Sequence, residues 1–145
     1  MSVKRAVAAG MAILLMLLFT GCASGYGETV EANWGIALPD GYEQAYQADT
    51  GARFHGDGVR YHVLSYPEEM EFEGIKWGAV SQETLFAGSA LEAAQDFLAQ
   101  LEIDEAWNIP YDRCVAYHQS QEDNSELLLF WDEEDAVLYI VENFL

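Results

Sequence analysis

The sequence predicts an α+β domain, a mostly antiparallel sheet with one main amphipathic helix packed on it. Two observations indicate this fold class. Three apolar segments, residues 113–119, 126–131 and 136–143, follow one another across short polar connections, which is the pattern of a C-terminal three-stranded antiparallel meander. Upstream of them, residues 89–102 repeat their apolar side chains at helical spacing instead.

The helix predicted over residues 89–102 has both a start signal and an apolar stripe. Ser89 is placed as the N-cap, and Glu92 three residues later completes a capping box. The apolar side chains that recur on one face are Leu91, Ala94, Phe97, Leu98 and Leu101. We expect this face to pack on the sheet rather than to bind a partner.

The last two predicted strands are apolar almost without alternation. A strand with one face in water alternates apolar and polar residues, whereas a strand covered on both faces does not. We therefore expect residues 127–131 and 136–141 to be covered on at least part of both faces, with the helix on one of them.

The first half of the domain predicts shorter elements. Residues 34–38 indicate a short strand, which ends at a turn over residues 39–41 with the sequence Pro-Asp-Gly. Residues 42–48 indicate a second extended segment, and residues 59–66 alternate as a strand does. Residues 68–75 follow a proline and predict one or two helical turns.

The N-terminus has the three-part layout of a secretory signal. Lys4 and Arg5 precede an apolar run over residues 6–19, and two small residues, Thr20 and Gly21, follow it. This run is shorter than the roughly 20 residues that span a bilayer as a helix. Cys22 comes directly after the small residues.

This arrangement resembles the lipobox of bacterial lipoproteins. The resemblance implies a diacylglycerol group on the thiol of Cys22 and cleavage before this residue, which anchors the chain on the extracytoplasmic face of the cell membrane. Residues 1–21 are then a signal peptide, residues 22–33 a lipidated cysteine with a flexible tether, and residues 34–145 a single globular domain. An N-terminal transmembrane anchor or an uncut signal is the alternative.

The composition restricts the partners of this domain. Lys4 and Arg5 are two of the six basic residues, so the remainder of the chain carries four basic against 25 acidic residues, a formal net charge of −21. Such a chain repels nucleic acid and anionic lipid headgroups. Basic proteins, envelope cations and divalent metals are permitted partners. The alternative is that the acidic charge only keeps an exported protein soluble.

The second cysteine has no partner if Cys22 carries lipid. Cys114 lies in a predicted strand, and no basic group that would lower its pKa is obvious in its sequence surroundings. We expect a buried, inert thiol, with a nucleophilic or intermolecular cysteine as the alternative.

The candidate ligand-binding site is the loop His55-Gly56-Asp57-Gly58. Its glycines let a ligand approach the backbone, and they place an imidazole and a carboxylate close together. The loop lacks the ligand spacing of an EF-hand and the Lys-Ser/Thr pair of a phosphate-binding loop. A tight glycine-rich turn that leads into a strand is the structural alternative.

Two possible metal sites have weaker sequence signals than the loop of residues 55–58. The histidines at positions 55, 62 and 118 have no spacing typical of metal ligands, although they could meet Cys114 in the fold. The acidic run of residues 132–135 could bind calcium weakly, or it could be a solvated turn that guards the sheet against edge pairing.

No catalytic motif is present, and we expect neither a cofactor nor an assigned catalytic residue. Residues 54–58, the sequence Tyr111-Asp112-Arg113 and the terminal acidic hairpin are similar to those of small lipoproteins of Firmicutes. That resemblance implies an α+β domain and a Gram-positive setting. The sequence thus favours a non-enzymatic binding module with an unknown protein or envelope partner, and the alternatives are a metal-binding lipoprotein and a cell-envelope hydrolase.

Overall fold

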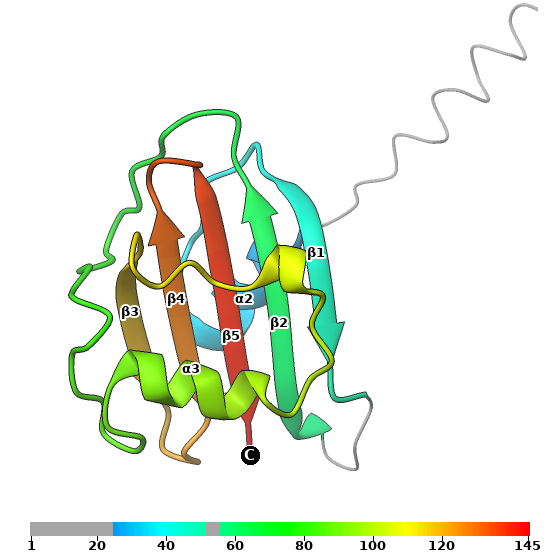
Figure 1. The fold of residues 1–145 in the computed structure, drawn as a ribbon, viewed down its shortest axis with the longest axis vertical. Coiled ribbons are helices and arrows are strands. Elements are labelled where there is room, and N and C mark those ends of the chain that lie inside the picture. Colours follow the sequence, from blue (N-terminus) through cyan, green and yellow to red (C-terminus); the bar gives the residue numbers. More distant parts are fainter. Residues whose placement is uncertain (1–24, 52–55) are drawn as a thin grey trace, which may run out of the picture.

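In the described residues, 25–51 and 56–145, five strands form one antiparallel sheet with a helix on each side (Figure 1). The structure is a computed structural model. The strands are β1 (Glu43–Asp49), β2 (Gly58–Ser65), β3 (Val115–Ser120), β4 (Glu126–Asp132) and β5 (Val137–Phe144), in the spatial order β1-β2-β5-β4-β3. Helix α3 (Ala90–Leu98) crosses the front face in Figure 1, and α2 (Tyr26–Trp34) lies behind the sheet. The predicted α+β class with a mostly antiparallel sheet is confirmed.

The C-terminal strand β5 lies at the centre of the sheet. It pairs antiparallel with β2 on one side, where Tyr61 is opposite Val141, and with β4 on the other, where Phe130 is opposite Tyr139. Strand β3 continues the sheet beyond β4, and β1 closes the other edge beside β2. The last strand of the chain therefore joins the N-terminal hairpin to the C-terminal strands.

The central strands β4 and β5 are buried on both faces, as their unbroken apolar runs predicted. Successive residues of a strand point to opposite faces, and the two hydrophobic clusters of the domain divide in this way. The cluster on the α2 side contains Val30, Trp34, Ile36, Leu64, Tyr66, Phe72, Leu127, Leu129, Trp131, Ala136, Leu138 and Ile140. The cluster on the α3 side contains Val59, Tyr61, Val63, Ala90, Ala93, Ala94, Ile109, Ala116, Leu128, Phe130, Tyr139 and Val141.

Helix α3 begins with the predicted capping box. The Ser89 hydroxyl accepts a hydrogen bond from the Glu92 backbone N–H at 3.2 Å, and the Glu92 carboxylate accepts one from the Ser89 backbone N–H at 3.3 Å. The helix ends at Leu98 rather than at Glu102. The chain turns there because Leu101 and the residues after it pack against the same cluster as the helix.

Helix α2 corrects two predictions from the sequence. The flexible tether predicted over residues 23–33 is wrong for the described residues, and the strand predicted over residues 34–38 is wrong as well. Tyr26–Trp34 is helical, and Gly35 ends the helix with a φ of +70° while its N–H donates to the Glu31 carbonyl at 2.8 Å. The segment folds because Val30 and Trp34 are buried against the sheet.

A buried carboxylate fixes α2 on the sheet. Glu142 on β5 is fully buried. Its Oε1 accepts a hydrogen bond from the Trp34 indole N–H at 2.6 Å, and its Oε2 accepts one from the Tyr26 hydroxyl. Burial raises the pKa of Glu142, while the hydrogen bonds from Tyr26 and Trp34 act in the opposite direction. Tyr26 also stacks on the His62 ring of β2, with ring centroids 3.3 Å apart.

Residues 68–75 do not form the predicted helical turns. They lie outside the helices and strands of the structure, and Gly74 has a φ of +75°. Phe72 is buried, and its ring packs edge to face on Trp131 with centroids 4.9 Å apart. An irregular path lets this segment cover the α2 side of the sheet beyond the end of the helix.

Glu142→Gln tests the cost of the buried charge. The pKa of this carboxyl is raised above its ordinary 4.5, so at a pH above 4.5 the folded chain holds a proton that the unfolded chain has released. Stability from this group is therefore lost as the pH rises from 4.5 through the folded-state pKa. The amide removes this loss and keeps an acceptor for Trp34, so we expect a higher free energy of unfolding at pH 7. Urea denaturation measures it, with the surface variant Glu102→Gln as control, and a lower stability than that of the control would contradict the account.

His62 predicts a pH dependence of the opposite sign. Burial and the positive charge of Arg60 lower the pKa of His62 from 6.5 to about 4, although the negative charge of Asp49 acts in the opposite direction. As the pH falls, the unfolded chain therefore binds this proton before the folded chain does. Stability is lost as the pH falls from 6.5 through 4, by about 3 kcal/mol at 1.36 kcal/mol per pKa unit.

The variant His62→Phe keeps a flat ring beside Tyr26 and removes this titration. It also removes a buried Nδ1 atom that has no hydrogen-bond partner. Urea denaturation at pH 7 and pH 4 is expected to show a smaller loss of stability in the variant, and equal losses in both proteins would rule out His62 as the source.

Candidate functional site

The predicted loop site leads into β2 at one end of the β1–β2 hairpin. His55 lies outside the described residues, whereas Gly56, Asp57 and Gly58 lie within them. Gly56 has a φ of +80° and Gly58 one of +130°, conformations that favour glycine. A hollow of about 250 Å³ lies here, lined by Asp49, Thr50, Gly51, Gly56, Asp57, Gly58, Val59 and Arg60.

Several polar groups of this hollow serve the hairpin itself. The Thr50 N–H donates to the Val59 carbonyl at 3.0 Å, and the Val59 N–H donates to the Thr50 hydroxyl at 3.1 Å. Asp49 accepts a hydrogen bond from the Gly51 N–H at 2.6 Å. The ligand-binding role of Gly56, Asp57 and Gly58 stays a prediction.

The described histidines do not come together. His62 lies on β2 and His118 on β3, and both β5 and β4 lie between those strands, a separation of about 14 Å at the usual strand spacing. In residues 25–51 and 56–145, no group of three or more His, Cys, Asp or Glu side chains is arranged to hold a metal ion.

Cys114 lies directly before β3 and is half-buried. Burial, with the negative charge of Asp132 as a second cause, raises the pKa of its thiol to about 12. The thiol is therefore protonated at neutral pH, and only a thiolate is a strong nucleophile. This environment is typical of an inert cysteine.

Ser120, His118 and Glu126 form a polar chain that does not have the geometry of a catalytic triad. His118 Nε2 lies 2.9 Å from Glu126 Oε1 and 3.1 Å from the Ser120 hydroxyl. A triad needs one imidazole nitrogen for the nucleophile and the other for the orienting carboxylate. Here one nitrogen faces both groups, so the arrangement ties β3 to β4 without activating the serine.

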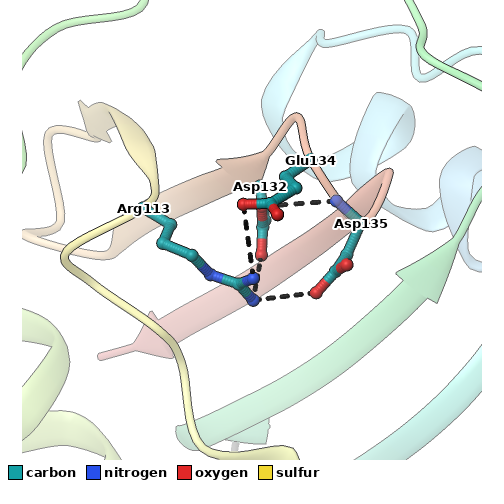
Figure 2. A network of polar contacts seen from close by, with 4 residues as sticks. All are labelled: Arg113, Asp132, Glu134 and Asp135. Carbon is teal, nitrogen blue, oxygen red and sulfur yellow. Dashed lines mark hydrogen bonds and ion pairs between the residues drawn. The ribbon is translucent and has the colours of Figure 1, made fainter.

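The Arg113 side chain, from the segment before β3, pairs with the acidic turn between β4 and β5 (Figure 2). The Arg113 guanidinium lies 2.7 Å from Asp132 Oδ2, 2.8 Å from Asp135 Oδ2 and 3.6 Å from Glu134 Oε2. Asp132 is fully buried, and its Oδ2 is paired with Arg113 without the alignment of a hydrogen bond. The Arg113 guanidinium therefore lies where a calcium ion bound by this turn would lie.

Next to this turn, an open groove of about 460 Å³ combines an apolar floor with an acidic rim. Its apolar lining comes from Met70, Phe72, Trp77, Val115 and Trp131. Its acidic lining comes from Glu69, Glu71 and Glu133. The neighbouring Glu133 carboxyl, with the charge of Glu71 as a smaller cause, raises the pKa of Glu69.

The floor of the groove is part of the hydrophobic core. Phe72 packs edge to face on Trp77, with centroids 5.4 Å apart, and on Trp131. Phe72 and Trp131 belong to the same cluster as Val30 and Trp34 of α2. The groove is therefore held by packed side chains rather than by a loop alone.

Sequence reasoning missed both the groove and the buried Glu142. Tyr26, Val30 and Trp34 recur at every fourth residue before Gly35, which is the signal that could have found α2. The groove joins residues 69–77 to residues 131–133, and no local pattern links segments so far apart in the chain.

Arg113→Gln is expected to lower the free energy of unfolding, because Asp132 is left buried without its cation. Thermal and urea denaturation measure the loss. Lys76→Gln removes the same charge from an exposed residue and is expected to change stability by less than about 0.5 kcal/mol. Equal effects of the two variants would show that the ion pair contributes nothing beyond net charge.

In the described part of the chain, none of the helices has the length and apolar character needed to cross a bilayer. Comparisons with protein-family models, with curated proteins and with solved structures found no match. We therefore infer a function from the residues of the site.

Proposed function

We propose that this chain is a lipid-anchored, extracytoplasmic lipoprotein whose domain is a non-enzymatic binding module. The support for the anchor is the sequence from Lys4 to Cys22, which resembles a lipobox signal. The C-terminal meander and the amphipathic helix α3 act as the scaffold of the domain in this proposal. The signal peptide and Cys22 lie outside the described residues.

The observation that carries the binding role is the groove beside the β4–β5 turn. Binding sites are concave and mostly apolar, with a few polar groups at defined positions, and the groove combines an aromatic floor with three carboxylates. The two alternatives gain less support. The acidic hairpin is paired with Arg113, and the Ser120–His118 contact shares its nitrogen with Glu126.

The helix α2 shortens the connection between anchor and domain. Three residues separate Cys22 from Tyr26, where the helix begins, and this connection spans at most about 14 Å when fully extended. Lipid on Cys22 would hold the domain close to the membrane surface. The acidic charge of the domain would at the same time oppose contact with anionic headgroups.

Mass spectrometry of the N-terminus from membrane fractions tests the anchor. We expect lipid on Cys22 in the wild type and in Cys114→Ala, and a water-soluble or unprocessed chain in Cys22→Ala. An intact Met1 without lipid in the wild type would contradict the lipoprotein assignment.

Cross-linking in cells tests the binding role. A photoreactive residue replaces Val115, which lines the groove and is partly exposed, or Ala99, which is exposed at the end of α3. We expect a discrete adduct from position 115 that disappears when Trp77→Ala is added, and no such adduct from position 99. The same adducts from both positions, or none from position 115, would contradict a binding role for the groove.

A further inference from the structure

We propose that the groove binds the cationic side chain of an arginine or lysine on a basic partner protein. The groove is the surface described above, lined by five apolar side chains together with Glu69, Glu71 and Glu133. The inference rests on the proposed function, because it assigns a ligand to the same groove.

The carboxylates of the β4–β5 turn are divided between Arg113 and the groove. Arg113 pairs with three of the four carboxylates of this turn and leaves out Glu133. Glu133 instead lines the groove together with Glu69 and Glu71, and carboxylates gathered in one groove repel each other. Among the described residues, Glu69, Glu71 and Glu133 form no ion pair with a basic side chain. A cation placed between them would relieve this repulsion.

The aromatic side chains of the groove can attract a cation. A guanidinium or ammonium group within about 6 Å of an aromatic ring centroid is attracted by the ring, most strongly by tryptophan. Trp77 and Trp131 both line the groove, with Phe72 packed against each of them. The apolar side chains Met70 and Val115 can cover the methylene stem of a long basic residue.

The same lining argues against other ligands. An anion would meet three carboxylates, and an apolar group would strip water from them without compensation. A bare metal ion needs several oxygen, nitrogen or sulfur ligands in one place, and among the described residues the carboxylates of the groove are not grouped to hold one. Arginine fits better than lysine, since its planar guanidinium can bond two carboxylates and stack on an indole ring.

The charge of the domain favours a separate basic partner over a second copy of the chain. Outside residues 1–21 the chain has four basic residues, and Arg113 is already paired. Two copies would bring together surfaces with a net charge of −21 each. A basic partner is instead steered toward the acidic domain by long-range attraction.

The test titrates the full-length protein, in nanodiscs of neutral phosphatidylcholine, with a capped peptide that carries one arginine between glycines and serines. The control peptide carries citrulline, which keeps the shape of arginine and lacks its charge. NMR shifts of the tryptophan indole N–H groups give the affinity. We expect the arginine peptide to shift the Trp77 and Trp131 signals with a dissociation constant on the order of 1 mM, and the citrulline peptide to bind at least tenfold more weakly.

Matched variants separate the groove from net charge. The double variant Glu69→Gln/Glu133→Gln removes two rim charges and is expected to weaken binding of the arginine peptide at least tenfold. Glu102→Gln with Glu122→Gln removes two exposed charges elsewhere and is expected to change the affinity less than twofold. Trp77→Leu, with both carboxylates intact, is expected to weaken binding at least threefold.

Equal binding of arginine and citrulline peptides, equal losses in the two double variants, or no shift of the groove signals would each overturn the cation assignment. The cross-link from position 115 then decides how far the failure extends. If the adduct persists, the groove still binds a partner and only the cation assignment fails. If the adduct is also absent, the proposed binding function fails with it.

Discussion

The structure depends on a sheet whose central strands are apolar on both faces. β4 and β5 contribute alternate residues to two separate hydrophobic clusters, so each face needs a cover. Burial of apolar surface contributes about 25 cal/mol per Å², which makes an uncovered face costly. Helix α3 covers one face, and α2 together with the segment after β2 covers the other (Figure 1).

The cover on the α2 side is positioned by a charge as well as by apolar packing. Tyr26 and Trp34 lie at the two ends of α2, and each donates to a different oxygen of Glu142. A helix shifted by one residue along the sheet would lose at least one of these bonds. A buried charge is weak evidence for stability, so we assign Glu142 a role in fixing the position of the helix. The same cluster extends from α2 to Phe72 and Trp131 at the floor of the groove.

The parts of the fold that could be predicted are those whose sequence pattern lies within a single helix or strand. The capping box of Ser89 and Glu92 marks the start of α3, and the apolar runs mark β4 and β5, because these patterns lie within one element. Helix α2 was missed because small and polar residues surround its three anchors, and because its position depends on contacts with Glu142, over a hundred residues later.

The candidate site was harder to predict than the fold. The sequence singled out residues 55–58 by composition, yet Asp49 and Thr50 use their polar groups to close the hairpin there. The acidic run of the β4–β5 turn could be seen in the sequence, but its division between Arg113 and the groove could not. That division depends on tertiary contacts, which give Glu133 a different environment from its neighbours.

The central claim is that α2 is an integral cover of the sheet, which connects the N-terminal segment to the floor of the groove. Hydrogen exchange of the full-length protein tests it most directly. The account predicts that the amides of Val30, Asn33 and Trp34 exchange as slowly as those of β2 and β5, since all of them open only when the domain unfolds. Exchange of these α2 amides at nearly the rate of an unfolded chain, with the sheet still protected, would contradict it.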